Sequence, residues 1–207
     1  MDFIDLAAFT LHDVKNRLAV LASRAEQKGD AETLHGVLEA AATLTRLLAY
    51  YKAGKGSLWI EEEARTPADL LNELTVEMGK QTGLTVSADP SAAPTLWFYD
   101  ENLVRMVLLN ALYNALRHAR QQVRMAACVR DGWLEFSVRD DGSGYPEAML
   151  GQPVALHSLS PEGTGLGLHL ANQVAALHRH AGQQGYVELS NEGGAVFRLR
   201  LPGHSLS

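Results

Sequence analysis

The sequence predicts an α+β protein in which a helical hairpin is followed by a domain of mixed helices and strands. Residues 1–53 repeat apolar side chains at heptad spacing, residues 123–138 alternate them as strands do, and residues 163–167 form a glycine-rich run that opens into a helical pattern. A chain of 207 residues can hold two small domains. We therefore expect a hairpin domain at 1–53, a linker at 54–65 and an α+β domain at 66–203.

The composition is that of a folded protein, because 46% of the residues are hydrophobic and 20% are charged. A formal net charge of −6 argues against nucleic acid or an anionic membrane surface as a partner. Cys128 is the sole cysteine, so no intrachain disulfide can form and a reducing cytoplasm is expected. Asp2 and Asp5 stand where a signal peptide needs positive charge, and no apolar run reaches membrane length. We therefore expect a cytoplasmic protein that binds neither membrane nor nucleic acid.

Residues 1–53 have the pattern of two helices joined by a turn at Gly29-Asp30. The seam positions of the first helix are Ile4, Ala7, Leu11, Val14, Leu18, Leu21 and Ala25. Those of the second helix are Leu34, Val37, Ala41, Leu44, Leu48 and Tyr51. Heptad seams suit near-parallel packing, but one hairpin of about 50 residues buries too little surface to be stable. We therefore expect a homodimeric four-helix bundle, with His12 at the flank of the seam and partly exposed.

The segment from 54 to 65 is typical of a solvated connector, because it contains Gly54, Gly56 and three consecutive glutamates. The sequence suggests at most one short strand there, around Leu58–Ile60. Thr66-Pro67 then starts a helix that runs to about Lys80, with a capping threonine and a proline at the first helical position.

Helices and strands are mixed in the rest of the chain. Two strands with clean alternation are expected around Val123–Val129 and Leu134–Val138, joined by a hairpin turn at Asp131-Gly132. The other expected elements are short strands at Leu84–Ser87 and Thr95–Phe98, a helix at Glu101–His118, a helix at the glycine run, and last strands at 185–190 and 195–201.

Asn110, Asn114 and Arg117 are spaced to share one face of the expected helix, opposite an apolar face. That apolar face consists of Leu108, Leu112 and Ala115. The asparagines can simply be surface residues. Alternatively, the amide oxygen of Asn114 can complete an oxygen shell for Mg²⁺, which favours such hard ligands.

Asp140-Asp141-Gly142-Ser143-Gly144-Tyr145 follows a hydrophobic strand. One interpretation is a tight turn with acidic residues. The other is that a carboxylate accepts the exocyclic amine of an adenine while the glycines admit the base. Residues 145–162 carry three prolines and suit a mobile lid.

The run from Gly163 to Leu168 places three glycines at alternate positions before a helix. Leu166, Leu170, Val174 and Leu177 fall on one face of that helix. Glycine allows a close approach to a ligand, and a helix start offers free N–H groups, which together suit a phosphate. A structural glycine turn is the alternative.

Three of these motifs resemble, in their order, the N box and two glycine boxes of the GHKL ATPase superfamily, which implies a Bergerat α/β sandwich with a mixed sheet. They are Asn110-Ala-Leu-Tyr-Asn114-Ala, Asp140-Asp-Gly142-Ser-Gly144 and Gly163-Thr-Gly165-Leu-Gly167-Leu. Upstream, Leu11-His12-Asp13-Val14-Lys15-Asn16-Arg17-Leu18 resembles the phosphoacceptor box of sensor histidine kinases. The resemblance therefore implies a HisKA-like dimerisation and phosphoacceptor hairpin before a GHKL-type ATP-binding domain.

The resemblance implies ATP and Mg²⁺ as cofactors. Asn114 would hold Mg²⁺, Asp140 would read adenine, and Arg117 stands where the family often has a basic residue near the phosphates. The other implied nucleotide-binding positions are Asn110, Gly142, Gly144, Gly163, Thr164, Gly165, Leu166 and Gly167. Relatives that hydrolyse ATP carry a glutamate general base at the position of Asn110, and an amide cannot take a proton from water. This favours a kinase over a hydrolase.

The upstream box implies that His12 is the phosphoacceptor and attacks the γ-phosphate through a ring nitrogen. Asp13 can accept the other ring N–H and fix the tautomer. Asn16 lies one helical turn after His12, and its spacing from Asp13 resembles a pattern that the family associates with dephosphorylation of the receiver. The implied partners are a second copy of the chain and the receiver domain of a response regulator. Because no sensor domain is visible, the input is expected from another protein or from direct binding.

The sequence departs from the family pattern in two places. Arg17 stands where many members have a proline, and residues 145–162 contain no lysine or arginine to meet a triphosphate. We expect a cytoplasmic two-component histidine kinase that autophosphorylates His12 and passes the phosphoryl group to a receiver aspartate. A non-catalytic phosphotransfer adaptor with a degenerate ATP-binding domain stays open, as does an anti-sigma-like serine kinase or regulatory binding module.

Overall fold

The computed structural model describes residues 3–30, 33, 36–37, 40–41, 60–79, 83–150 and 166–203. The chain divides into two compact units, Met1–Leu58 and Trp59–Ser207.

The N-terminal unit contains the long helix α1 (Phe3–Lys28). The helix ends at Gly29, whose φ of 67° lets the Asp30 N–H reach back to the Ala25 carbonyl at 3.0 Å. The Asp30 carboxylate then accepts hydrogen bonds from the Thr33 N–H (3.0 Å) and hydroxyl (2.7 Å), and these bonds lower the pKa of Asp30. The expected turn is therefore present, and residues 33, 36–37 and 40–41 are helical. The paired hairpin and its dimer remain predictions.

The second unit is built on a mixed five-stranded sheet with the order β2-β4-β5-β9-β8. β2 (Thr85–Ala92) runs parallel to β4 (Gln122–Arg130). Antiparallel pairings join β4 to β5 (Trp133–Asp140), β5 to β9 (Ala195–Pro202) and β9 to β8 (Tyr186–Asn191). The mixed sheet expected from the sequence is confirmed.

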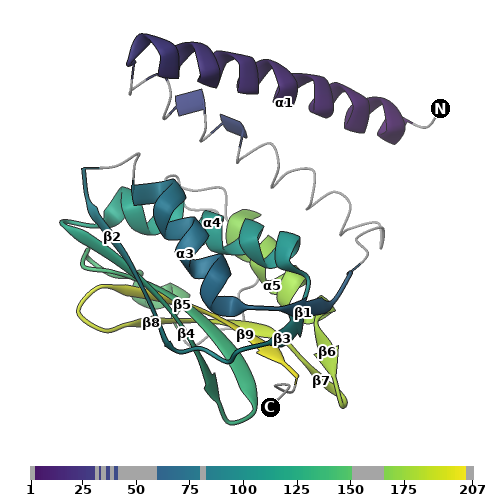
Figure 1. Ribbon diagram of the computed structural model, residues 1–207, viewed down its shortest axis with the longest axis vertical. Coiled ribbons are helices and arrows are strands. Elements are labelled where there is room, and N and C mark those ends of the chain that lie inside the picture. Colours follow the sequence, from purple (N-terminus) through teal and green to yellow (C-terminus); the bar gives the residue numbers. More distant parts are fainter. Residues whose placement is uncertain are drawn as a thin grey trace. The chain divides into compact units, whose positions relative to one another are not determined.

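Three helices cover one face of this sheet (Figure 1). α3 (Pro67–Gly79) lies against β2, α4 (Glu101–His118) against β5, and α5 (Leu166–Leu177) against β8. α4 presents the expected apolar stripe, with Leu108, Leu112 and Ala115 all buried. Within the part of the chain that the structure describes, none of the helices combines the length and apolar character needed to cross a membrane.

Alternation along the central strands builds the other half of the core. Opposite one another on β5 and β9, each pair of apolar residues is buried: Leu134 with Leu201, Phe136 with Leu199, and Val138 with Phe197. The hairpin between β4 and β5 turns at Asp131 (φ 53°) and Gly132 (φ 81°), as expected for a two-residue loop. Val129, next to that turn, shares one strand face with Val123, Met125 and Ala127 by alternation. Those three are buried, whereas Val129 is 43% exposed.

Strand β2 is longer than the sequence predicts. The expected strand ended at Ser87, whereas β2 continues through Pro90 to Ala92. Asp89-Pro90-Ser91 has the composition of a turn, but β2 is an edge strand, where a residue without an N–H is tolerated. The register shifts between Asp89 and Ala92.

Two short strand pairs complete the second unit. β1 (Glu63–Arg65) pairs with β3 (Trp97–Tyr99), so a strand lies within the expected linker. Of the short strand expected around Leu58–Ile60, Leu58 and Trp59 lie outside the described residues. The side chains of β1 are largely charged and give no alternation signal. β6 (Arg179–His180) and β7 (Gln183–Gln184) form a hairpin that the sequence did not reveal, because two-residue strands are too short for periodicity.

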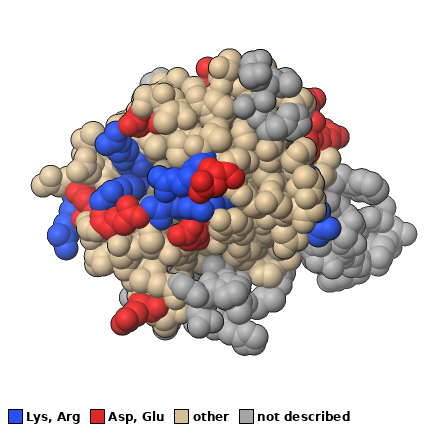
Figure 2. All heavy atoms as spheres, turned by 90° about the horizontal axis from the view of Figure 1, so that it is seen from below, with Lys and Arg blue, Asp and Glu red and all other residues tan. Residues whose placement is uncertain are grey.

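The sheet face away from the helices carries ion pairs. Figure 2, which views the molecule from below Figure 1, shows positive and negative side chains gathered side by side. Among the ion pairs of this face, the Glu135 carboxylate is buried, 3.4 Å from Arg198 Nε and 2.9 Å from Arg200 Nη2. The two guanidinium groups offset the cost of burying Glu135.

Candidate nucleotide site

Asp140 is a buried carboxylate at the carboxyl end of β5, with 5% of its surface exposed. Its Oδ1 accepts hydrogen bonds from the backbone N–H groups of Gly142 (2.7 Å) and Ala195 (3.1 Å). The described residues make no hydrogen bond to Oδ2. Because a carboxylate keeps acceptor capacity after two hydrogen bonds, Oδ2 can accept an N–H from a ligand such as adenine.

Asp141 anchors the same turn to the chain that follows α4. Its Oδ1 accepts from three consecutive backbone N–H groups, those of Arg120 (2.8 Å), Gln121 (3.1 Å) and Gln122 (3.3 Å). These hydrogen bonds, the one from Gln121 foremost, hold the pKa of Asp141 below its usual value. The two adjacent aspartates therefore have different roles. Asp141 fixes the turn, whereas Asp140 keeps Oδ2 available to a ligand.

Two glycines bring the motifs into contact. A Cβ on Gly142 would lie 3.0 Å from both Asp140 Oδ1 and the His118 carbonyl carbon at the end of α4. A Cβ on Gly167, in the first turn of α5, would lie 2.6 Å from Oδ1 of Asn110 on α4. Side chains do not fit at these distances, so glycine is required for the close approach. The end of β5 and the start of α5 therefore both lie against α4.

Asn114 and Arg117 lie on the exposed face of α4, beyond Asn110. Their exposure leaves the Asn114 amide accessible to a ligand, and an amide oxygen suits Mg²⁺, which retains several waters and needs few protein ligands. The described residues contain no group of three or more His, Cys, Asp or Glu that could hold a metal ion.

Gly144 closes the turn with φ 84°, a conformation that residues with a Cβ rarely adopt. A Cβ there would also lie 2.7 Å from the side chain of Asn191, the last residue of β8. Asn191 accepts a hydrogen bond from the Tyr145 N–H (2.7 Å) and donates one to the Tyr145 carbonyl (2.9 Å). Burial raises the pKa of the Tyr145 phenol, and the charge of Asp140 raises it further.

Several residues singled out in the sequence lie outside the described part. Gly163, Thr164 and Gly165 are among residues 151–165, which also contain most of the expected lid. The backbone of Leu166 begins α5, but its side chain is outside the description. His12, Asp13 and Asn16 lie in helix α1, and their side chains are likewise outside it. Their roles remain predictions.

Sequence reasoning missed the contribution of the turn between β8 and β9. Ala195 donates its N–H to Asp140, and a Cβ on Gly194 would lie 2.8 Å from the Asp140 carbonyl carbon. The run Asn191-Glu192-Gly193-Gly194 has ordinary hairpin composition, which accounts for the local conformation. Its contact with Asp140 spans 55 residues, and no local pattern signals it.

A buried histidine was also missed. It lies where α4 begins and α5 ends, at the ends of these helices away from the candidate nucleotide site. His178 is 1% exposed, accepts a hydrogen bond from the Asp100 N–H at Nε2 (3.1 Å), and places Nδ1 2.8 Å from the Val174 carbonyl. The ring is therefore neutral, with its proton on Nδ1. Burial lowers the pKa of His178, outweighing the Val174 hydrogen bond and the charge of Asp100.

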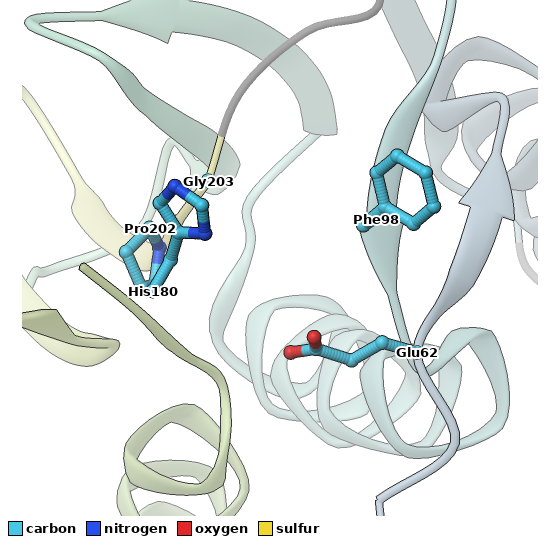
Figure 3. A pocket seen from close by; sticks show the side chains of 5 residues that line it. All are labelled: Glu62, Phe98, His180, Pro202 and Gly203. Carbon is cyan, nitrogen blue, oxygen red and sulfur yellow. The ribbon is translucent and has the colours of Figure 1, made fainter.

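A pocket of about 280 Å³ lies near the same ends of these helices. Its lining residues are Glu62, Phe98, His180, Pro202 and Gly203. Figure 3 shows the Glu62 carboxylate directed toward the side where His180 and Pro202 lie. Phe98 precedes α4, whereas Asn114 lies in its second half, about 20 Å along the helix axis from Glu101 at 1.5 Å per residue. This pocket is therefore separate from the candidate nucleotide site.

The fold is a helix-covered mixed sheet, and these contacts gather the candidate nucleotide residues along α4. Residues 99–205 match the family described as histidine kinase-, DNA gyrase B-, and HSP90-like ATPase, which is more than half of the 207-residue chain. The chain belongs to this family.

Similar sequences are histidine kinases and sensor proteins. The histidine-protein kinase AfsQ2 of Streptomyces coelicolor is 36% identical over 50% of this chain and 20% of its own length. The sensor protein PhoQ of Escherichia coli K12 is 29% identical over 79% of this chain and 36% of its own. The histidine kinase component HK1 of Mycobacterium tuberculosis is 31% identical over 58% of this chain and 70% of its own. The chain thus spans between a fifth and about a third of AfsQ2 and PhoQ.

Solved structures show the same fold. Full-length ShkA in complex with AMPPNP matches with a TM-score of 0.70 and 21% identity, over 98% of this chain and 46% of its own. The ATP-binding domain of PrrB from Mycobacterium tuberculosis matches with a TM-score of 0.57 and 30% identity, over 70% of this chain and 99% of its own.

Proposed function

We propose that this chain is the phosphoacceptor and ATP-binding part of a two-component histidine kinase. His12 is phosphorylated from ATP, and the phosphoryl group passes to an aspartate of a response-regulator receiver domain. The observation that carries the proposal is the packing of Gly167 against the amide of Asn110, because it puts an amide at the start of α5, where the proposed phosphate site lies. The histidine kinases among the similar proteins support it.

The residues present fit ATP and Mg²⁺. Asp140 offers a buried acceptor oxygen for the adenine amine, and the start of α5 offers N–H groups to phosphate. Asn114 supplies an amide oxygen to the metal, and Arg117 supplies positive charge on the same exposed face of α4. Mg²⁺, when bound, neutralises charge on the triphosphate.

The identity of residue 110 favours phosphoryl transfer to protein over hydrolysis. A hydrolase needs a base that takes a proton from the attacking water, and the Asn110 amide is no base at neutral pH. Water at this position is therefore not activated, and the phosphoryl group survives until a protein nucleophile reaches it.

His12 supplies that nucleophile in the proposal. A neutral ring nitrogen forms a bond to the γ-phosphorus while the bond from phosphorus to the bridging oxygen breaks, and ADP leaves. Asp13, the next residue, accepts the N–H of the other ring nitrogen and stabilises the positive charge that develops on the ring. The phosphoramidate formed is a high-energy donor for a receiver carboxylate.

The decisive experiment is labelling with [γ-³²P]ATP and Mg²⁺ followed by acid and alkali treatment. We expect acid-labile, alkali-stable label on the wild type and none on His12→Gln, because His12 is the proposed sole acceptor among eight histidines. His180→Gln, in the separate pocket, is the matched control and should label normally. Label retained on His12→Gln would reject the assignment.

A phosphotransfer adaptor is the second candidate, favoured by the absence of lysine and arginine from residues 145–162. It keeps the His12 hairpin and uses the second unit without ATP. Calorimetry separates the two, because an adaptor with a lapsed site shows no heat of binding at millimolar ATP. The kinase binds ATP in a Mg²⁺-dependent manner.

A further inference from the structure

The turn from Asp140 to Tyr145 is held at its two ends by different side chains. At its entrance, Asp140 bonds the Gly142 and Ala195 N–H groups and Asp141 bonds three N–H groups after α4. At its exit, the Asn191 amide bonds both the N–H and the carbonyl of Tyr145. The amide thus acts on Tyr145 as a neighbouring strand would, with one donor and one acceptor.

The same residue shapes the path of the turn. Asn191 fills the space that a Gly144 side chain would need, since a Cβ there would lie 2.7 Å from its amide carbon and oxygen. Asn191 also pairs with Ala195 in the β8–β9 register, and Ala195 bonds Asp140. The Asn191 side chain therefore bonds Tyr145 at the exit of the turn, and its strand partner Ala195 bonds the Asp140 carboxylate at the entrance.

The consequence falls on Tyr145 and Asp140. Fixing both polar groups of the Tyr145 backbone fixes where its half-buried ring leaves the chain. Tyr145 ends the turn that begins at Asp140, whose Oδ2 is the acceptor proposed for the base. A shift of the Tyr145 backbone would move the ring and change the path of the turn that carries Asp140.

We propose that Asn191 is a positioning residue for base selectivity, which acts through the backbone of Tyr145 to hold a narrow, correctly oriented space beside Asp140. This inference rests on the proposed ATP site. Adenine presents an amine donor to a carboxylate oxygen, whereas guanine presents a carbonyl acceptor at the equivalent ring position and is repelled. Such discrimination requires that the base cannot slide or tilt, and Asn191 supplies that constraint.

The test is the ratio of the dissociation constants for GTP and ATP, measured with Mg²⁺ on the full chain. Removing two hydrogen bonds in Asn191→Ala should weaken ATP binding about three- to tenfold and weaken GTP binding less, so that the ratio falls. Ser190→Ala is the matched control, because the Ser190 hydroxyl bonds Arg198 and Glu192 on the open sheet face. The control should leave the ratio unchanged.

A merely structural role predicts a different result. Loss of folded protein lowers the active fraction for both nucleotides alike and leaves the ratio constant. Hydrogen exchange of the Tyr145 amide gives a second readout, and we expect faster exchange in Asn191→Ala at an unchanged melting temperature. Asn191→Ser, which retains one hydrogen-bonding group, should fall between wild type and Asn191→Ala.

An unchanged GTP-to-ATP ratio with intact ATP binding would overturn the role of Asn191 and leave the proposed function standing. Wild type that binds no ATP would overturn both. Variants that no longer melt cooperatively would make Asn191 a folding residue and likewise reject the proposal.

Discussion

The Cα of Gly167, in the first turn of α5, lies against the side-chain amide of Asn110 on α4, with no room between them for a methyl group. Two motifs separated by more than fifty residues in the sequence therefore meet at a single contact. The contact between Asn110 and Gly167 therefore helps to position α4 and α5 relative to each other.

Replacing Gly167 with alanine should lower the free energy of unfolding by about 1–3 kcal/mol, because the added methyl group overlaps Asn110. In an Asn110→Ala background the same change should be neutral or stabilising, since alanine is the better helix former. Chemical denaturation of the four proteins gives the coupling energy. Gly79→Ala is the control, as a Cβ there meets nothing within 4 Å. Additive effects would contradict the contact.

Asp140→Asn should preserve the fold and weaken ATP binding by about 1–3 kcal/mol. In the variant, the amide oxygen of Asn should occupy the position of Oδ1, because two backbone N–H groups donate hydrogen bonds there. The NH₂ group then replaces Oδ2 and offers the adenine amine a second donor instead of an acceptor. Calorimetry with ATP, beside a melting curve, separates the two effects. Unchanged affinity would remove Asp140 from adenine recognition.

Charged residues in place of Leu18 and Leu44 should convert a homodimer into monomers. Both positions belong to the heptad seams, and an unpaired charge in a bundle core is costly. Sedimentation at micromolar concentration reports the mass directly. A monomeric wild type would contradict the predicted bundle.

Asn16 should accelerate loss of phosphate from the receiver. An amide one helical turn after His12 can orient a water in line with an aspartyl phosphate. The aspartate carboxylate is a good leaving group, so positioning the water supplies most of the rate. A phosphorylated cognate receiver should decay more slowly with Asn16→Ala than with wild type, each without ATP. His12 should still label in the variant. Equal decay rates would leave a one-way kinase.

Protonation of His178 should destabilise the second unit below neutral pH. Its folded-state pKa is lowered chiefly by burial, so the unfolded chain binds the proton more tightly. Stability should therefore be full above the unfolded pKa of about 6.5 and fall as the pH drops below it, by at most about 1.4 kcal/mol per pH unit. Denaturation at pH 7.5 and 5.5 should show a smaller difference for His178→Leu than for wild type. A pH difference in His178→Leu as large as that of wild type would contradict this role of His178.

Sequence pattern sufficed where a local rule decides the structure. The helix at Glu101–His118, the turn at Asp131-Gly132 and the apolar face of α4 follow from periodicity and turn chemistry, and all three are confirmed. The full length of β2 was missed because its edge position, a property of the assembled sheet, overrides the turn composition around Pro90. Asn191 and Ala195 were missed for a related reason, since their contacts with the Asp140 turn arise only when distant strands meet.

Strand β1 sets a limit on how the second unit can be shortened. The Glu61 N–H donates to Asp100 Oδ2 at 3.0 Å, and β1 pairs with the β3 strand that holds Trp97 and Tyr99 in the core. A recombinant fragment that begins at the capping residue Thr66 would keep α3, α4 and α5. It would lose β1, the strand that pairs with β3, and the hydrogen bond from the Glu61 N–H to Asp100, the N-cap of α4. Fragments for crystallisation or NMR should therefore begin ahead of Glu61.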